Sequence, residues 1–238
     1  MTKEILILAS GNGSNAEAIV QYARRKALPI NFTAGCNRSP DKAGVYDKMN
    51  RLFVQTYHLP TIGKGYLSCS LLDFLDAAPK FDLIMLAGYM KIIPSDITEN
   101  NNMLNIHPSI LPFNYKGSLD AYSDALTNGD TRTGCTIHKV SPDVDGGQII
   151  AQIGFNIPPN IELDTLKAIG LAHEHALYPA VMEAELFGAK LDMVDIARRI
   201  RELLCKNGLG EVMHGCNTII PDVRNGRKFF SEFNGKGR

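Results

Sequence analysis

The first hundred residues alternate between short apolar runs and amphipathic segments. Ile5-Leu6-Ile7-Leu8 is a continuous apolar run, and residues 14–25 after it carry an apolar stripe at helical spacing. The same alternation predicts further strands over 30–36, 53–57 and 82–86, and helices near 41–50 and 67–77. A chain of this pattern is expected to fold as an α/β protein, with a mostly parallel sheet flanked by helices on both faces.

The second half of the pattern is less regular. It predicts a weak helix over 97–102, a short strand over 104–106, a loop and then a helix over 114–126, and a strand pair over 134–140 and 148–157. A long helix is expected over 163–187, kinked or split at Pro179 because proline lacks a backbone N–H.

The character of the chain changes after Leu191. An amphipathic helix is predicted over 194–205, followed by a Gly/Asn/Arg-rich tail. We therefore expect one domain over 1–191 and a C-terminal helical extension over 192–238, whose role the sequence does not indicate.

Composition narrows the class of protein. The 238 residues carry 25 basic and 25 acidic side chains, and this zero balance argues against a nucleic-acid partner. No apolar run reaches the length of a spanning helix, so no membrane partner is expected. The five cysteines are scattered without a Cys-x-x-Cys pair, which indicates reduced thiols and a cytoplasmic protein.

The loop from Ser10 to Asn15, Ser-Gly-Asn-Gly-Ser-Asn, lies between the first predicted strand and helix. Glycines allow a tight turn, and the free N–H groups of a helix start suit a phosphate. The alternative is a simple turn in which Ser14 caps the helix. The position at the carboxyl end of a parallel strand favours the phosphate site.

Asn105 and His107 stand two apart on a predicted strand, so their side chains share one face. Asparagine can donate a hydrogen bond to a carbonyl oxygen, and histidine can move a proton near neutral pH. Pro108 and Pro112 bracket the next segment and are expected to hold it extended. The alternative is a strand-end histidine that is satisfied by a backbone carbonyl.

Asp145 belongs to the turn Asp143-Val144-Asp145-Gly146-Gly147. A carboxylate there could orient His107 or an attacking water, and the diglycine would permit close approach of a ligand. A tight turn with solvated carboxylates is the simpler alternative. The acidic series of a calcium loop is missing and no zinc pattern is present, so no metal is expected. His138, on the strand before this turn, could line or support the site.

With these motifs, the chain resembles the formyltransferases that use 10-formyltetrahydrofolate. Residues 104–112 and the Asp145-Gly146-Gly147 turn are specific for that family, and the likeness runs from about residue 5 to 191. It implies a Rossmann-like sheet with the folate in a cleft beside the strand ends. The loop 10–15 points to the branch that formylates the amine of glycinamide ribonucleotide in purine biosynthesis.

The resemblance also implies a role for each matching residue. It makes Asn105, His107 and Asp145 the catalytic set, and Glu174 the contact of the substrate ribose. Phosphate binding falls to Gly13, Ser14 and Asn15. The folate would be bound by Lys64, Met90, Lys91, Ile92, Ile93, Val140 and Ser141.

The chain departs from the family pattern at a few positions. Tyr122 stands where a histidine is frequent, the stretch 113–122 is slightly longer, and Leu171 replaces a polar residue near the phosphate. The chief alternative function is a formyltetrahydrofolate hydrolase, which uses the same three residues on water. A methionyl-tRNA formyltransferase or a non-catalytic nucleotide-binding module fits the sequence less well. A homodimer is one possible oligomeric state.

Overall fold

The computed structural model of the protein describes residues 1–60 and 69–211, and within them a seven-stranded sheet of order β3-β2-β1-β4-β5-β6-β7. Strands β1 to β5 pair in parallel, whereas β6 is antiparallel to both β5 and β7. The predicted α/β fold with a mostly parallel sheet is therefore confirmed. The strands are β1 (Lys3–Ala9), β2 (Ile30–Cys36), β3 (Gln55–His58), β4 (Leu83–Leu86), β5 (Met103–His107), β6 (Arg132–Lys139) and β7 (Ile149–Asn156).

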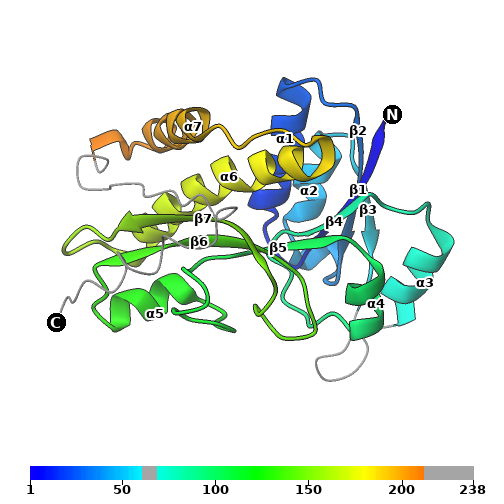
Figure 1. Ribbon diagram of the computed structural model, residues 1–238, viewed down its shortest axis with the longest axis horizontal. Helices are drawn as coiled ribbons and strands as arrows, with labels where there is room; N and C mark the ends of the chain where they lie inside the picture. The colour runs from blue at the N-terminus through cyan, green and yellow to red at the C-terminus, as the bar shows by residue number, and fades with distance from the viewer. Residues whose placement is uncertain (61–68, 212–238) are drawn as a thin grey trace.

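Helices cover both faces of this sheet (Figure 1). One face packs against α1, α2, α5 and α6, and the other against α3 and residues near α4. A short 3₁₀ turn, η1, precedes α2. The helical elements are α1 (Ser14–Arg25), η1 (Pro40–Lys42), α2 (Val45–Arg51), α3 (Cys69–Ala77), α4 (Ser95–Asn100), α5 (Ala121–Thr127), α6 (Leu163–Phe187) and α7 (Met193–Lys206).

Strand β1 shows how the sequence divides the core between the two faces. Ile5 and Ile7 lie in the larger apolar cluster, which includes α1 and α6, while Leu6 and Leu8 lie in the smaller one with Leu71 of α3. Successive side chains of a strand point to opposite faces, so a strand that is covered on both sides is apolar throughout. This explains the unbroken run that opens the sequence.

Two predicted helices differ from the observed ones. The helix expected over 41–50 is divided, because Ala43 is extended and Gly44 leads into α2. The helix expected over 97–102 lies earlier, since Pro94 caps the start of α4 at Ser95. Both errors lie at element ends, where proline and glycine override apolar periodicity.

Helix α6 continues through Pro179 as one helix of 25 residues, so the expected split is wrong, and a kink there stays a prediction. Burial explains this outcome, because Tyr178, Pro179 and Val181 are enclosed in the core and tertiary packing offsets the missing hydrogen bond.

Helix α7 packs alongside α6, on the side away from the sheet (Figure 1). The Asp192 side chain caps the start of α7 by accepting hydrogen bonds from the N–H groups of Val194 and Asp195. Its apolar stripe, made of Ile196, Ile200 and Leu204, joins the larger core cluster. Whether the chain divides at residue 191 stays a prediction, and the tail after residue 211 lies outside the described residues.

None of the described helices is long and apolar enough to span a membrane.

Candidate active site

A cavity of about 620 Å³ opens beside the carboxyl ends of β1, β4 and β5. The strand order reverses between β1 and β4, which is where open α/β sheets bind ligands. Its volume suits a small-molecule ligand. The predicted site residues that line it are Asn15, Met90, Lys91, Ile92, Ile93, Asn105, His107, Val140, Ser141, Asp145 and Glu174.

Two predicted residues lie outside this lining, and a third is not among the described residues. Gly13 and Ser14 start α1 but do not belong to the cavity lining. Lys64, expected near the folate tail, lies outside the described residues.

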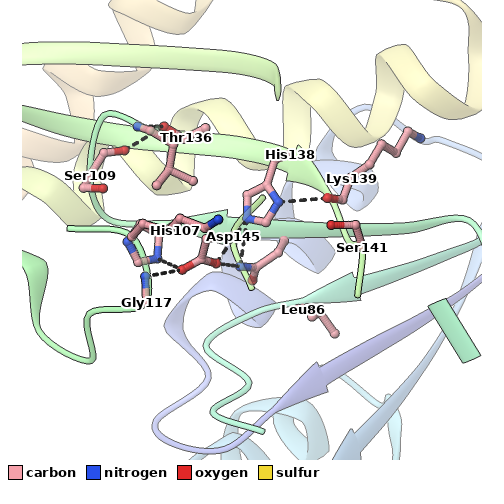
Figure 2. Close-up of polar contacts among 12 residues, drawn as sticks. Leu86, His107, Ser109, Gly117, Thr136, His138, Lys139, Ser141 and Asp145 are labelled. Carbon is pink, nitrogen blue, oxygen red and sulfur yellow. Dashed lines mark hydrogen bonds and ion pairs between the residues drawn. The ribbon is translucent and has the colours of Figure 1, made fainter. Parts of the chain in front are cut away.

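Asp145 lies beside His107, Gly117 and His138 (Figure 2). Its Oδ2 lies 3.2 Å from Nδ1 of His107 and accepts the N–H of Gly117 at 2.9 Å. Its Oδ1 lies 3.4 Å from the amide nitrogen of Asn105. Asn105 and His107 of β5 therefore both lie close to the carboxylate of Asp145, which follows them by about forty residues in the sequence.

The turn that carries Asp145 is held in shape by its own atoms. Asp145 has a φ of 49°, a left-handed conformation that is uncommon outside glycine. A Cβ at Gly146 would lie 2.0 Å from the Asp143 carboxylate, and one at Gly147 would lie 1.8 Å from the Lys139 carbonyl oxygen. Packing against backbone thus requires glycine at position 147, and the close approach of a ligand to the diglycine stays a prediction.

His138 supports this group from β6. It is paired with Asn105 across the antiparallel strands, at a register shift that re-aims the side chain. Its Nδ1 faces the Lys139 carbonyl at 2.9 Å, so Nε2 is free to accept from the Asn105 amide at 3.1 Å. His138 therefore fixes the orientation of Asn105, with its Nε2 also 3.5 Å from Asp145.

The charge state of Asp145 follows from these contacts. Burial raises its pKa, but the adjoining His138 ring, the field of His107 and the Gly117 N–H together hold the pKa below the usual aspartate value. Asp145 is consequently ionised at neutral pH and supplies a fixed negative charge behind the two histidines.

His107 faces two acceptors, the Asp145 carboxylate at Nδ1 and the Tyr115 carbonyl at Nε2, 2.9 Å away. Both contacts are hydrogen bonds only when the ring carries two protons. Burial lowers its pKa below the usual histidine value, although Asp145 and the Tyr115 carbonyl act to raise it. A ring of this kind gains a proton most easily when negative charge appears beside it. The alternative of a histidine that is satisfied by a backbone carbonyl is thus half right. The Tyr115 carbonyl contacts one ring nitrogen, and the Asp145 carboxylate contacts the other.

The segment after His107 is folded into turns, so the expected extended conformation is wrong. The Ser109 N–H donates to the His107 carbonyl, and the Asn114 N–H donates to the Ile110 carbonyl. Thr136, which is paired with His107 across the strands, accepts the Leu111 N–H and donates to the Ser109 carbonyl. These bonds fix the chain direction beyond β5.

The loop before α1 has the geometry of a helix start without a side-chain cap. Gly13 is its N-cap in the left-handed conformation, with a φ of 75°, and no side chain caps the helix, so the alternative of a Ser14 cap is wrong. A Cβ at Gly13 would lie 2.7 Å from Val45, so this position requires glycine for space as well. Lys48 reaches the loop by donating to the Asn12 side chain at 2.7 Å. The helix start and this cation together favour an anion.

Glu174 belongs to the cavity lining and is 5% exposed. Its carboxylate accepts from the Asn15 amide at 2.7 Å and from the Tyr122 hydroxyl at 3.1 Å. Burial raises its pKa, against the effect of both donors. Tyr122 fits because Gly170 leaves room for its ring: a Cβ there would lie 2.2 Å from it. Tyr122, which stands where the family often has a histidine, therefore donates a hydrogen bond to Glu174, the residue predicted to contact the substrate ribose.

Another part of the cavity lining is apolar. Met90 and Ile92 expose about half of their side chains, while Ile93 is buried beneath them. The Met90 N–H already donates to the Ser10 hydroxyl, which ties the β1 and β4 loops together. Val140 and Ser141 form the facing wall.

The described histidines outside this group form no metal-binding cluster. No group of three or more His, Cys, Asp or Glu side chains that could hold a metal is found in residues 1–60 and 69–211. His173 stacks on Phe155 in the core, with ring centroids 4.3 Å apart. His58 lies exposed on β3, and His214 is outside the described part of the chain.

Sequence reasoning did not assign roles to several residues of the site. The sequence predicted only that His138 could line or support the site, because its contact with Asn105 depends on the β5–β6 register. Tyr115 and Gly117 act through backbone atoms, which leave no mark on side-chain patterns. The partnership of Tyr122 with Glu174 joins residues 52 apart and is visible only in the fold.

The chain belongs to the formyl transferase family, whose model matches residues 3–182. The family resemblance read from the motifs is thereby confirmed. The phosphoribosylglycinamide formyltransferase of Haemophilus influenzae is 32% identical over 185 residues, which are 76% of this chain and 86% of that protein. The crystal structure of phosphoribosylglycinamide formyltransferase from Bacillus halodurans superposes with a TM-score of 0.70 at 32% identity, covering 79% of this chain and 97% of that one.

The human trifunctional purine biosynthetic protein adenosine-3 is 33% identical over 183 residues. These are 75% of this chain but only 18% of the human protein, so the chain corresponds to one part of it.

Proposed function

We propose that the protein transfers the formyl group of 10-formyltetrahydrofolate to the amine of glycinamide ribonucleotide, a step of purine biosynthesis. The observation that carries the proposal is the meeting of Asn105, His107 and Asp145 on the wall of one cavity. The lining of that cavity includes both the apolar Met90 side chain and the buried carboxylate of Glu174. The names of the relatives support the same reaction.

The chemistry requires stabilisation of one oxygen and movement of one proton. The substrate amine attacks the formyl carbon, a new C–N bond forms, and the carbonyl electron pair moves onto the oxygen. The Asn105 amide donates to that oxygen by exchanging its long contact with Asp145. One such donor lowers the barrier by about 3 kcal/mol.

His107 and Asp145 complete the cycle. The developing negative charge favours the protonated His107 ring, which the Asp145 carboxylate holds in place at 3.2 Å. The proton lost by the attacking nitrogen passes to N10 of the folate as the old C–N bond breaks, with Asp145 assisting the transfer. No covalent enzyme intermediate or metal is required.

Two parts of the cavity lining match the two substrates. The helix start at Gly13, Ser14 and Asn15 binds the phosphate, and Glu174 accepts hydrogen bonds from the ribose hydroxyls. The folate ring lies against residues 90–93 with Val140 and Ser141 opposite, and Lys64 approaches its tail. Residues 1–191 form the catalytic domain of a cytoplasmic enzyme that works without a nucleic-acid or membrane partner; a homodimer is one possible state.

The hydrolase alternative uses the same trio on water, and the named relatives do not favour it. Purified protein is mixed with a 10-formyl folate, with or without glycinamide ribonucleotide, and release of the deformylated folate is followed by absorbance. We expect release only with the ribonucleotide. Equal release in its absence would refute the proposed transfer and establish hydrolysis.

A further inference from the structure

Helix α6 contains a carbonyl that its own backbone cannot satisfy. In an α-helix the N–H of residue 179 would donate to the carbonyl of residue 175, but Pro179 has no N–H. The His175 carbonyl therefore needs a partner from elsewhere. This gap lies one residue from Glu174, the proposed ribose ligand.

Arg199 of α7 supplies that partner. Its guanidinium donates to the His175 carbonyl at 3.1 Å and to the Ala176 carbonyl at 3.1 Å. The side chain is 7% exposed and its guanidinium lies over the Tyr22 ring of α1, 4.2 Å from the ring centroid. The planar, two-pronged guanidinium suits two neighbouring oxygens, and the aromatic ring limits its movement.

The same turn of α6 is fixed on its sheet side. Tyr178, one turn after Glu174, donates from its hydroxyl to the carbonyls of Leu86 at 3.2 Å and Leu104 at 2.9 Å. Those residues belong to β4 and β5, the strands that lead into the cavity. Tyr178 and Arg199 thus bind the proline-containing part of α6 from the sheet side and from the α7 side.

We propose that Arg199 is a positioning residue for substrate binding, because it completes the hydrogen bonding of the proline-interrupted turn and so holds Glu174 in place. The family model ends at residue 182, so this arginine and α7 lie beyond the part of the chain that the family defines. The inference rests on the proposed role of Glu174 and gives the C-terminal extension a function in the ribonucleotide site.

The test compares two variants of α7. Arg199→Met keeps the apolar stem and removes the guanidinium, whereas Leu204→Ala weakens the α7 packing without touching the α6 carbonyls. We expect Arg199→Met to raise KM for glycinamide ribonucleotide about tenfold or more, with kcat and KM for the folate changed less than about twofold. Arg199→Lys, which retains one cationic donor group, should recover part of the loss.

Backbone hydrogen exchange tests the positioning without any substrate. We expect Arg199→Met, but not Leu204→Ala, to speed exchange locally over residues 172–180. Unchanged exchange there, or an equal rise of KM in Leu204→Ala, would overturn the inference. Failure of the proposed function is distinguishable, because the wild-type protein would then show no ribonucleotide-dependent turnover while the exchange result still decides the role of Arg199.

Discussion

Replacing Asp145 by asparagine removes one charge from the centre of the site and changes little else. The side chain keeps its shape, and asparagine tolerates the left-handed backbone of this position, where φ is 49°. One amide oxygen can still accept the Gly117 N–H. The charge that steadies a protonated His107 is lost.

The geometry sets the size of the effect. Asp145 and His107 are 3.2 Å apart, and their side chains are 10% and 6% exposed. Unit charges at that distance interact by about 5 kcal/mol at an effective dielectric constant of about 20. Allowing for partial compensation by the amide, we expect a loss of about 3 to 5 kcal/mol, which is roughly a hundredfold to several thousandfold in kcat.

Steady-state kinetics with both substrates measures this loss, and melting temperature checks that the variant is folded. Asp143→Asn is the matched control, because it removes a carboxylate from the same turn. The Asp143 side chain is 70% exposed and forms an ion pair with Lys116. The control should stay within about twofold of wild type. A kcat for Asp145→Asn within tenfold of wild type, or an equal loss in the control, would refute the reasoning.

Two further predictions concern stability. Gly170→Ala should lower the free energy of unfolding by about 1–3 kcal/mol, because its Cβ would meet the buried Tyr122 ring; Gly11→Ala, with open space at its Cβ, should not, and equal urea midpoints for both would contradict the clash. Burial lowers the pKa of His173 and of His175 to about 4, so between pH 6.5 and pH 4 only the unfolded chain binds protons at these sites. Stability should therefore fall as pH falls, by roughly 2 kcal/mol for each ring at about pH 5; urea unfolding that is independent of pH from about 7 to 5 would be the contrary result.

The alternation of apolar runs was sufficient to predict the parallel sheet, because buried strands such as β1 must be apolar on both faces. It could not locate the break before α2 or the uninterrupted α6. Ala43 and Gly44 decide the first through backbone conformation, and the burial of Pro179 decides the second. The local periodicity of apolar residues predicts neither the backbone conformation at Ala43 and Gly44 nor the burial of Pro179.

The candidate site is likewise predictable from the sequence only in part. Asn105 and His107 share a strand face, so their proximity follows from spacing alone. Their meeting with Asp145 and the contact of His138 with Asn105 depend on the antiparallel pairing of β5 with β6. The bond from Tyr122 to Glu174 needed the packing of α5 on α6, which no motif specifies.

The fate of the formyl group tests the central claim most directly. The protein is incubated with glycinamide ribonucleotide and a folate whose formyl carbon is isotopically labelled, and the products are separated by mass. The account predicts that the label appears in the amide of the ribonucleotide, one equivalent for each folate released. Label recovered as free formate, with the ribonucleotide unchanged, would contradict it.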